Sequence, residues 1–340
     1  MLDLAREVLA GEQAWVVGGA VRDELLGRPV NDLDIACREP QRGARAYARR
    51  SGGAPFPLSE RHGAWRVALD DGRTVDFTPL SDGIEDDLAT RDFALNAIAV
   101  PVEGGDPVDP YGGRADLEAR VIRVVRDSVF SDDPLRLLRA VRLEHELGFR
   151  LDERAVELVR ASAALVTKPA GERVLGELER LSADGFRRLD ELGLLAPLGG
   201  TLTGPLDALD QPWFRLVAVF GERLGELPIS NELRRYARAL LRAEAPTDDS
   251  ARAIHRFRKA TEPWALDALV YVGAPRLAGS VERARAQEPT EPLVRGDELG
   301  LPPGPEIGRV LAAIEEERAA GTITTREAAL ELAQRLTKYP

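Results

Sequence analysis

The chain has few of the residues that form covalent cross-links or soft-metal sites. Its 340 residues include one cysteine, Cys37, and three histidines, His62, His145 and His255. A single cysteine excludes an internal disulfide and a cysteine-based zinc site, and the histidines are isolated, without the His-Asp pair that metal phosphohydrolases use. We therefore expect Cys37 to be a small buried residue in a protein of a reducing compartment.

Long apolar runs and an excess of positive charge are also missing. No run of roughly eighteen apolar residues occurs, as a membrane-spanning helix would need, although 44% of the residues are hydrophobic. The N-terminal residues show no basic-then-apolar signal pattern, so we expect a globular, cytoplasmic protein of about two or three domains. The formal net charge of −11 argues against a nucleic-acid partner, because phosphate binding is normally driven by Lys and Arg.

The distribution of arginines can outweigh that average charge. Arginines that recur along helices of the central region could line one side of a cleft, while acidic residues occupy the opposite surface. The alternative is that they pair with glutamates on ordinary helix surfaces. The arginines are Arg136, Arg139, Arg142, Arg173, Arg180, Arg187 and Arg188, and the nearby glutamates are Glu172, Glu177 and Glu179.

A turn near the N-terminus is suited to phosphate groups. The apolar run at 15–17 predicts a short buried strand, and Gly18 and Gly19 follow it directly. Two glycines allow a tight turn whose N–H groups can face a triphosphate at the start of the next helix. Arg22 would add a forked cation to the same phosphates.

A pair of carboxylates follows this turn. Asp32 and Asp34 are two residues apart, so on a strand over 33–36 both would point to one face of a sheet. Such a pair suits Mg²⁺, which takes its remaining ligands from water and substrate phosphates. Alone, either feature is more often a plain turn or a solvated strand end, but their ordered combination indicates nucleotidyl transfer.

Several segments, in order, resemble the motifs of the class II tRNA nucleotidyltransferase and poly(A) polymerase family, whose members build or repair the 3′ CCA end of tRNA. The likeness is dense to about residue 181, weak to about 292, and present again at the end of the chain. The segments are VVGGAVRDELLGRPVNDLDIA at 16–36, ATRDFALNAIAV at 89–100, DPYGGRADLEARVIRVV at 109–125, SDDPLRLLRAVR at 131–142, GERVLGELERL at 171–181 and LVRGDELGLPPGPEIGRVLAAIEEERAAGTITTREAALELA at 293–333.

The resemblance implies an enzyme that adds CMP, with AMP as a further donor nucleotide, to the 3′ end of tRNA. It implies two Mg²⁺ ions per reaction, held by Asp32 and Asp34, and it implies tRNA, CTP and ATP as partners. No membrane and no obligate protein partner is indicated.

The implied fold is α+β, a nucleotidyltransferase head with a small mixed sheet followed by an all-α neck, body and tail. Pro134 is expected in the first turn of a helix capped by Ser131 or Asp132. The expected strands are 14–17, 33–36, 64–69, 74–78 and 121–125. The expected domains are the head at 1–128, the neck at 129–190, the body at 191–290 and the tail at 291–340.

A third catalytic carboxylate usually stands on an adjacent strand, and the candidate is Asp76. Alternation along the strand places Val75 and Phe77 in the core and Asp76 toward the cleft. The alternative for Asp76 is a surface position beside Arg73.

The second segment would contribute to nucleotide binding. By resemblance, Arg91 or Asp92 contacts the sugar and phosphates, and Asn96 braces the site. Glu172 and Arg173 would support the nucleotide pocket from the neck, although an ordinary ion pair near a helix start explains them nearly as well.

Asp133 and Arg136 are implied to read the incoming base. A carboxylate accepts from the exocyclic amino group of cytosine or adenine, and a guanidinium donates to the neighbouring ring acceptor, whereas G and U present the opposite pattern. Arg139 and Arg142 share the helix face of Arg136 and would hold triphosphate or tRNA backbone. For Asp132 and Asp133, the alternative is that they are simply acidic residues at a helix N-terminus, where the helix dipole favours negative charge.

The connection between Thr78 and Asp87 is short, with only the eight residues 79–86 between them. Full CCA-adding members of the family usually carry a longer flexible loop there, associated with the switch from C to A. We therefore expect addition of CC, with full CCA addition or A addition as alternatives. Further alternatives are a poly(A) polymerase, a small-molecule nucleotidyltransferase and a non-catalytic tRNA-binding protein.

Overall fold

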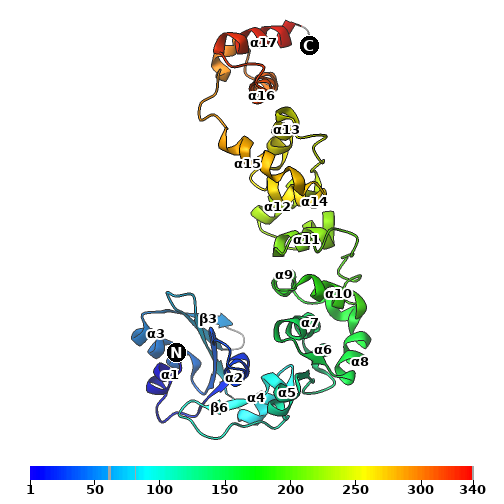
Figure 1. The fold of residues 1–340 in the computed structure, drawn as a ribbon. Coiled ribbons are helices and arrows are strands. Elements are labelled where there is room, and N and C mark those ends of the chain that lie inside the picture. The colour runs from blue at the N-terminus through cyan, green and yellow to red at the C-terminus, as the bar shows by residue number, and fades with distance from the viewer. Residues whose placement is uncertain (60–62, 81, 339–340) are drawn as a thin grey trace. The chain divides into compact units, whose positions relative to one another are not determined.

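Six strands near the N-terminus form one mixed sheet in the computed structural model, which describes residues 1–59, 63–80 and 82–338 (Figure 1). The strand order is β3-β4-β5-β2-β1-β6. The central pair β2 and β5 is parallel and the other neighbours are antiparallel, which confirms the predicted mixed sheet. The strands are β1 (Ala14–Val17), β2 (Asp32–Cys37), β3 (Ala54–Ser59), β4 (Ala64–Ala68), β5 (Thr74–Pro79) and β6 (Ala99–Pro101).

Local patterning located four of these strands to within a residue at each end. The predicted strand over 121–125 is wrong in its length, because only β7 (Val121–Ile122) forms and Val124 instead makes an isolated bridge to Phe93. The sequence missed β3, which carries two prolines, and β6, which is three residues long. Both strands depend on a neighbouring strand more than on their own residue preferences.

Helix α3 (Pro40–Ser51) covers one face of the sheet. Its Tyr47 packs edge-on against Phe77 with ring centroids 6.0 Å apart, and a Cβ at Gly43 would lie 3.0 Å from the Phe77 ring. Val75 and Phe77 therefore face this helix, as alternation predicts. Cys37 is fully buried, which confirms its expected position.

The first of two compact units, Met1–Leu198, contains this sheet and the helices up to α10. A two-residue strand, β8 (Arg150–Leu151), lies in its otherwise helical second half and pairs in parallel with β7. The α+β fold is thus confirmed. The remaining helices of the unit are α1 (Leu2–Val8), α2 (Gly19–Leu25), α4 (Ile84–Ala89), α5 (Gly113–Ala119), α6 (Val129–Asp132), α7 (Arg136–Leu147), α8 (Glu153–Ala161), α9 (Gly171–Leu178) and α10 (Ala183–Glu191).

The expected capping of the helix at Pro134 is wrong. Ser131 and Asp132 belong to the preceding helix α6, and α7 begins only at Arg136. Between them, Asp133 adopts an extended backbone, and its Oδ1 accepts a hydrogen bond from the Leu135 N–H. A short polar side chain that bonds the backbone two residues ahead forms a turn, which is why the chain breaks here.

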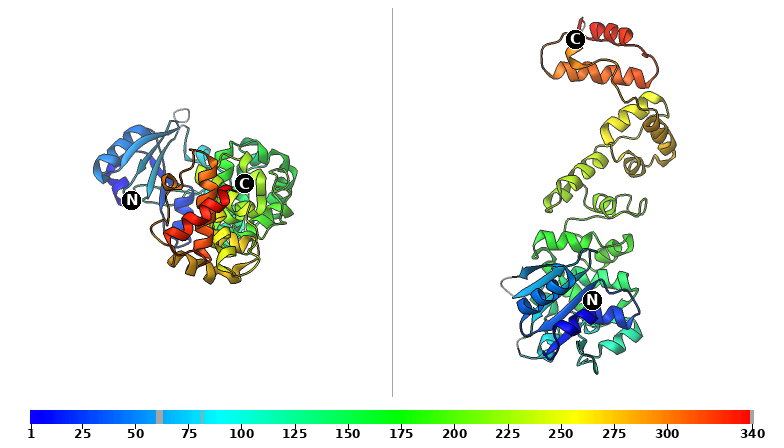
Figure 2. Two further views of the ribbon diagram at one scale, coloured as in Figure 1. Left: turned by 90° about the horizontal axis from the view of Figure 1, so that it is seen from above. Right: turned by 90° about the vertical axis from the view of Figure 1, so that its left-hand side faces the viewer.

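The second unit, Gly199–Pro340, is helical within its described residues. Tyr236 packs edge-on between Trp213 and Trp264. Helices α16 and α17 lie against one another (Figure 2), and an apolar cluster lies between them. The boundaries expected at 128, 190 and 290 stay predictions. The α-helices are α11 (Pro212–Phe220), α12 (Asn231–Leu241), α13 (Ala251–Thr261), α14 (Ala265–Tyr271), α15 (Ala278–Ala286), α16 (Pro305–Ala319) and α17 (Arg326–Lys338).

Over residues 1–59, 63–80 and 82–338, the chain contains no helix both long and apolar enough to cross a membrane.

Candidate active site

The strand register brings the three predicted carboxylates to one face of the sheet. Asp34 on β2 stands directly opposite Asp76 on β5, and Asp32 stands opposite Thr74. The Thr74 hydroxyl donates to Asp32 Oδ1 at 2.7 Å. Because paired residues share a face, all three carboxylates lie on the side of the sheet away from α3.

Arg66 on β4 is a member of this site that sequence reasoning missed. It stands opposite Asp76 in the β4–β5 register, and its Nε and one terminal nitrogen donate to the two Asp76 oxygens at 2.7 Å each. The sequence offered Arg73 as the surface partner instead, but Arg73 pairs with Asp71. Alternation along the predicted strand 64–69 gives the sheet face on which Arg66 lies, but it does not show which strand lies next to it.

The electrostatics around Asp34 fit a divalent cation. Desolvation by burial raises the pKa of Asp34 above its ordinary value, and the negative charges of Asp76 and Asp32 raise it further, against the opposing effect of Arg91 and Arg139. A bound cation would favour the ionised carboxylate, and hard oxygen donors are what Mg²⁺ requires.

The carboxylates do not by themselves form a closed cage. Nowhere in the described part of the chain do three His, Cys, Asp or Glu side chains gather closely enough to hold a metal. Because Asp76 is ion-paired with Arg66, Asp32 and Asp34 are the two carboxylates that remain available to a metal ion. Mg²⁺ at a nucleotide site commonly binds to one or two carboxylates together with phosphates, so the residues present fit this ion.

The Gly18 turn lies directly beside Asp34. Gly18 caps α2 with a φ of +71°, and a Cβ there would lie 3.1 Å from Asp34 Oδ2 and 3.3 Å from a terminal nitrogen of Arg91. A positive φ and this close approach both require glycine. At Gly19 an added Cβ would meet Arg22 at an ordinary 3.4 Å, so the second glycine is not sterically demanded.

Arg22, Asp92 and Asn96 form a bracing network behind the turn. Arg22 donates to Asn96 Oδ1 at 2.8 Å and pairs with Asp23, and the Asn96 amide donates to Asp92 Oδ1 at 3.0 Å. Asp92 and Asn96 are both buried. The geometry therefore favours bracing for Asp92 as well as for Asn96, while binding of phosphates by Arg22 stays a prediction.

Asp92 also ties the head to helix α7. Its Oδ2 forms an ion pair with Arg139 Nε at 2.7 Å. Burial alone would raise the pKa of Asp92, but Arg139, the Asn96 amide and the Phe93 N–H together hold it below its ordinary value. Arg91 faces the other way, toward the Gly18 turn, and donates to Asp87 at 2.7 Å and 3.0 Å.

The two predicted base readers have different partners in the structure. Asp133 pairs with Arg173 of α9 at 2.8 Å, and Arg136 donates to the Thr90 carbonyl at 2.8 Å. Arg173 thus holds Asp133 directly, whereas Glu172 is exposed, and support of a nucleotide pocket by these two residues stays a prediction. Reading of the base by Asp133 and Arg136 stays a prediction.

The remaining arginines of the central region are mostly ion-paired. Arg142 is 5% exposed and donates to Glu146 and Glu177, so the geometry favours a structural position for it over contact with triphosphate or tRNA. Arg180 pairs with Glu146, and Arg188 pairs with Glu144. Pairing with acidic residues is thus observed within the described part of the chain, and Glu177 is one of the expected glutamate partners, although these three pairs join different segments of the chain.

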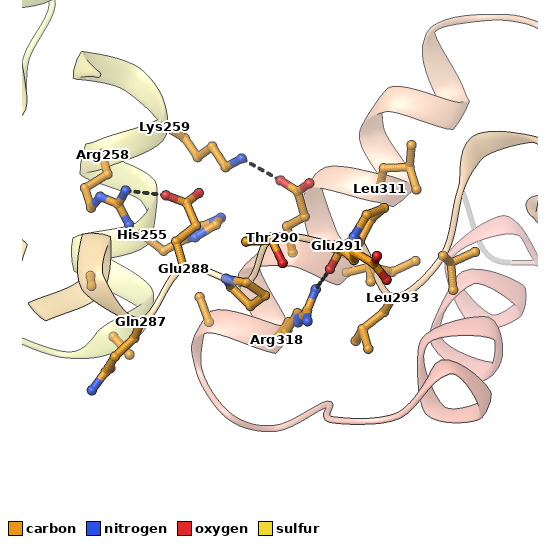
Figure 3. Close-up of a pocket in the computed structure, with 18 of the residues that line it drawn as sticks. His255, Arg258, Lys259, Gln287, Glu288, Thr290, Glu291, Leu293, Leu311 and Arg318 are labelled. Carbon is orange, nitrogen blue, oxygen red and sulfur yellow. Dashed lines mark hydrogen bonds and ion pairs between the residues drawn. The ribbon is translucent and has the colours of Figure 1, made fainter. Parts of the chain in front are cut away.

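A separate cavity of about 650 Å³ lies in the second unit, between α13, the segment after α15 and α16 (Figure 3). Several of its charged groups have partners within the lining. Arg258 bonds Glu288 at 2.6 Å, Lys259 bonds Glu315 at 2.6 Å, and Arg318 donates to the Glu291 carbonyl (Figure 3). None of the residues predicted for the active site line it.

Comparison with known proteins places these features in one family. Residues 14–78 and 64–123 match the family described as "Poly A polymerase head domain". The chain is 34% identical to an A-adding tRNA nucleotidyltransferase from Deinococcus radiodurans, over 95% of each chain. It is 32% identical to a CC-adding tRNA nucleotidyltransferase from Thermus thermophilus, over 94% of this chain and 92% of that one.

A shorter match and a structural match agree with these two. The chain is 46% identical to a CC-adding tRNA nucleotidyltransferase from Geobacter sulfurreducens over 50% of its own length and 40% of that protein. A solved structure described as a CCA-adding enzyme with ATP has a TM-score of 0.79 at 22% identity, over 100% of this chain and 95% of that one. At this identity the structural match shows the fold alone.

Proposed function

Because the chain belongs to the family of tRNA nucleotidyltransferases, we propose that it adds CMP to the 3′ end of tRNA without a nucleic-acid template. The observation that carries the proposal is the register that sets Asp32, Asp34 and Asp76 on one sheet face beside the Gly18 turn. CTP is the donor and tRNA the acceptor. The cytoplasm, where both occur, is the proposed location.

The reaction joins the tRNA 3′-oxygen to the α-phosphorus of CTP. A new P–O bond forms, the bond from the α-phosphorus to the oxygen that bridges it to the β-phosphate breaks, pyrophosphate leaves, and the hydroxyl proton passes to solvent. Asp32 and Asp34 would hold Mg²⁺, which would supply charge neutralisation for the transfer. Gly18 admits the triphosphate close to the backbone, and Arg91 faces it from the other side of the turn.

The base is selected at the break between α6 and α7. Asp133 is held by Arg173 and by the Leu135 N–H, yet a carboxylate has further lone pairs to accept from the cytosine amino group. Arg136 donates to the adjacent ring acceptor. A uracil or guanine presents the opposite pattern of donors and acceptors, so the lone pairs of Asp133 and the N–H groups of Arg136 that face the base would lack partners once the base covers them, and this loss is costly.

The short connection after β5 supports addition of CC alone. β5 ends at Pro79 and α4 begins at Ile84, and the far end of α4 is held by Arg136 at the Thr90 carbonyl and by Arg126 at the Ala89 carbonyl. A longer loop could move α4 and with it Arg136. With each residue adding at most about 3.6 Å of reach, this connection has little slack for such a shift.

Addition of AMP to tRNA that ends in CC is the second candidate. It is supported by the 34% identity to the A-adding relative over 95% of both chains. The relatives therefore include both specificities over nearly the full length.

Three tRNA substrates separate these functions. Transcripts that end before the first C, after CC and after CCA are each incubated with the protein, Mg²⁺ and one labelled nucleotide. We expect CMP on the first transcript only, in two steps. Fast AMP addition to the CC end indicates the second candidate, long A tracts indicate a poly(A) polymerase, and no incorporation on any transcript contradicts the proposal.

A further inference from the structure

The sheet face that holds the carboxylates continues to an exposed aromatic ring on the edge strand. The register pairs Phe56 with Arg66, Arg66 with Asp76, and Asp76 with Asp34. Directly paired residues point to the same face, so these four side chains form one row across β3, β4, β5 and β2. Phe56 is 42% exposed and stands at the open end of this row.

The exposure of Phe56 is unusual for this chain. Large apolar side chains that are exposed in the described residues are Leu25, Phe56, Leu58 and Leu202, and Phe56 is the aromatic one. β3 also carries Pro55 and Pro57, which cannot donate N–H bonds to an added strand. The edge is therefore poorly suited to pair with another strand, and the ring is the part of it that can bind a partner.

The in-line geometry of the proposed transfer indicates which substrate approaches the Phe56 side of the sheet. In the proposed transfer the attacking oxygen and the leaving pyrophosphate lie on opposite sides of the α-phosphorus. The proposed function assigns the triphosphate to the Gly18 turn, which follows β1. The acceptor 3′ end must then approach from the opposite side of the carboxylates, over β5, β4 and β3.

The spacing of the strands fits the last nucleotides of that acceptor. Phe56 is two strands away from Asp76, about 10 Å at about 4.8 Å per strand. An aromatic ring there meets a base close to the 3′ end while the terminal hydroxyl reaches Asp76 and Asp34.

We propose that Phe56 is a stacking platform for a base next to the 3′ end of the RNA acceptor. This inference rests on the proposed function and adds the acceptor subsite to it. A stacking contact suits a template-independent enzyme, because the acceptor end changes with every addition and a ring stacks on any base.

The test compares Phe56→Ala with Phe56→Trp, and Leu202→Ala serves as the matched control at an exposed apolar residue of the other unit. For tRNA that lacks its CC end, Phe56→Ala is expected to raise the KM for tRNA about tenfold, in the range that loss of one stacked base gives. The KM for CTP and the rate at saturating tRNA should change less than about twofold. Phe56→Trp and Leu202→Ala should resemble the wild type.

A second readout does not need catalysis. An acceptor-stem RNA with 2-aminopurine as its next-to-last nucleotide is mixed with protein in the absence of CTP. Stacking quenches 2-aminopurine fluorescence, so we expect quenching by the wild type and by Phe56→Trp, and its loss with Phe56→Ala. Thermal unfolding of each variant shows that the fold is kept.

The outcomes separate this inference from the proposed function. Unchanged tRNA KM and unchanged quenching in Phe56→Ala overturn the stacking platform while the enzyme remains active. Absence of incorporation by the wild type contradicts the proposed function, and the quenching arm still decides the inference. If Phe56→Ala turns a wild-type dimer into a monomer without changing RNA binding, the ring serves self-association and the inference is wrong.

Discussion

At the scale of single residues, the site combines groups whose charges oppose one another. Asp32, Asp34 and Asp76 share one face, and Arg66 neutralises only Asp76. Burial first, and then the charges of Asp76 and Asp32, raise the pKa of Asp34, which disfavours its ionised form. Such strain is common at functional sites, where stability is given up for binding.

Asp34→Ala is expected to lower CMP incorporation by at least about 100-fold, since a proposed metal ligand is lost and each tenfold corresponds to roughly 1.4 kcal/mol of barrier. Stability should not fall. A carboxyl whose folded pKa is raised stabilises the fold at low pH and loses this stabilisation as pH rises through the folded pKa, so the variant should gain in relative stability at pH 7. Labelled incorporation and urea unfolding measure both effects.

Asp71→Ala is the control for Asp34→Ala, because Asp71 is an exposed turn residue paired with Arg73. Retention of more than about a tenth of the wild-type rate by Asp34→Ala would contradict its assignment as a metal ligand.

Arg66→Ala should bind Mn²⁺ more tightly and turn over more slowly. Removal of the guanidinium leaves Asp76 unneutralised beside Asp34, which strengthens attraction for a cation, and it also frees the Asp76 carboxylate to rotate. We expect affinity several-fold higher by electron paramagnetic resonance and kcat about tenfold lower. Arg66→Lys keeps the charge and should keep the wild-type Mn²⁺ affinity. Equal affinity in all three proteins would show that Arg66 has no influence on the metal.

Cys37 is expected to be unreactive in the native protein. Burial raises the pKa of its thiol to about 12, with a smaller contribution from Glu12, so the thiol stays protonated at physiological pH. Ellman's reagent at pH 8 should react with less than a tenth of the protein on the time scale of minutes, and with all of it in urea, to judge from the roughly 10⁻⁴ thiolate fraction. Fast reaction of the folded protein would place Cys37 outside the core.

At the scale of elements, strand register and a helix break decide which side chains meet. The β4–β5 pairing brings Arg66 to Asp76, and the turn at Asp133 separates α6 from α7. Helix α7 then carries Arg139 to Asp92 and so fastens the helical half of the first unit to its sheet half. This ion pair joins elements that are far apart in the sequence.

Arg139→Ala is expected to destabilise the first unit by about 2 kcal/mol. Loss of one partner of an enclosed ion pair costs roughly 3–5 kcal/mol, and because the Arg139 side chain is 41% exposed, water offsets part of the loss. Asp92 has a lowered folded pKa, so its stabilisation is present above the unfolded pKa and lost as pH falls through the folded one.

The destabilisation by Arg139→Ala should accordingly be larger at pH 7 than at pH 3, as measured by urea unfolding. The double variant Arg139→Met with Asp92→Asn removes both charges and should recover part of the stability. An equal loss at both pH values would mean that packing, and not the charge of Asp92, causes the effect.

At the scale of the whole molecule, the predicted catalytic and nucleotide-binding residues all belong to the unit Met1–Leu198. The second unit has its own apolar cluster around α16 and α17. Units with separate cores commonly fold separately.

A fragment of residues 1–198 is therefore expected to fold and to bind CTP within about threefold of the full-length affinity, while its affinity for tRNA falls at least tenfold because part of the contact surface is missing. Circular dichroism, equilibrium dialysis with CTP and filter binding with tRNA measure these properties. Full tRNA affinity of the fragment would show that the second unit does not contribute to acceptor binding.

The sequence by itself determined the local features of the site. The period-2 pattern located β1, β2, β4 and β5 and assigned Asp32, Asp34 and Asp76 to one face, because strand geometry follows from neighbouring residues. The ordered motifs determined the family. Gly18 could be recognised because a glycine pair after a strand indicates a tight turn, which is again a local property.

Only the tertiary structure decided which partners these residues have. Alternation gives the face of Arg66 but not the neighbour of its strand, and helical spacing gives the surface of α7 but not that Arg142 is enclosed by Glu177 from α9. The sequence pattern likewise does not show that Arg173 pairs with Asp133, forty residues away in the sequence. Such contacts arise when distant segments pack together, and no short-range pattern encodes which segments will meet.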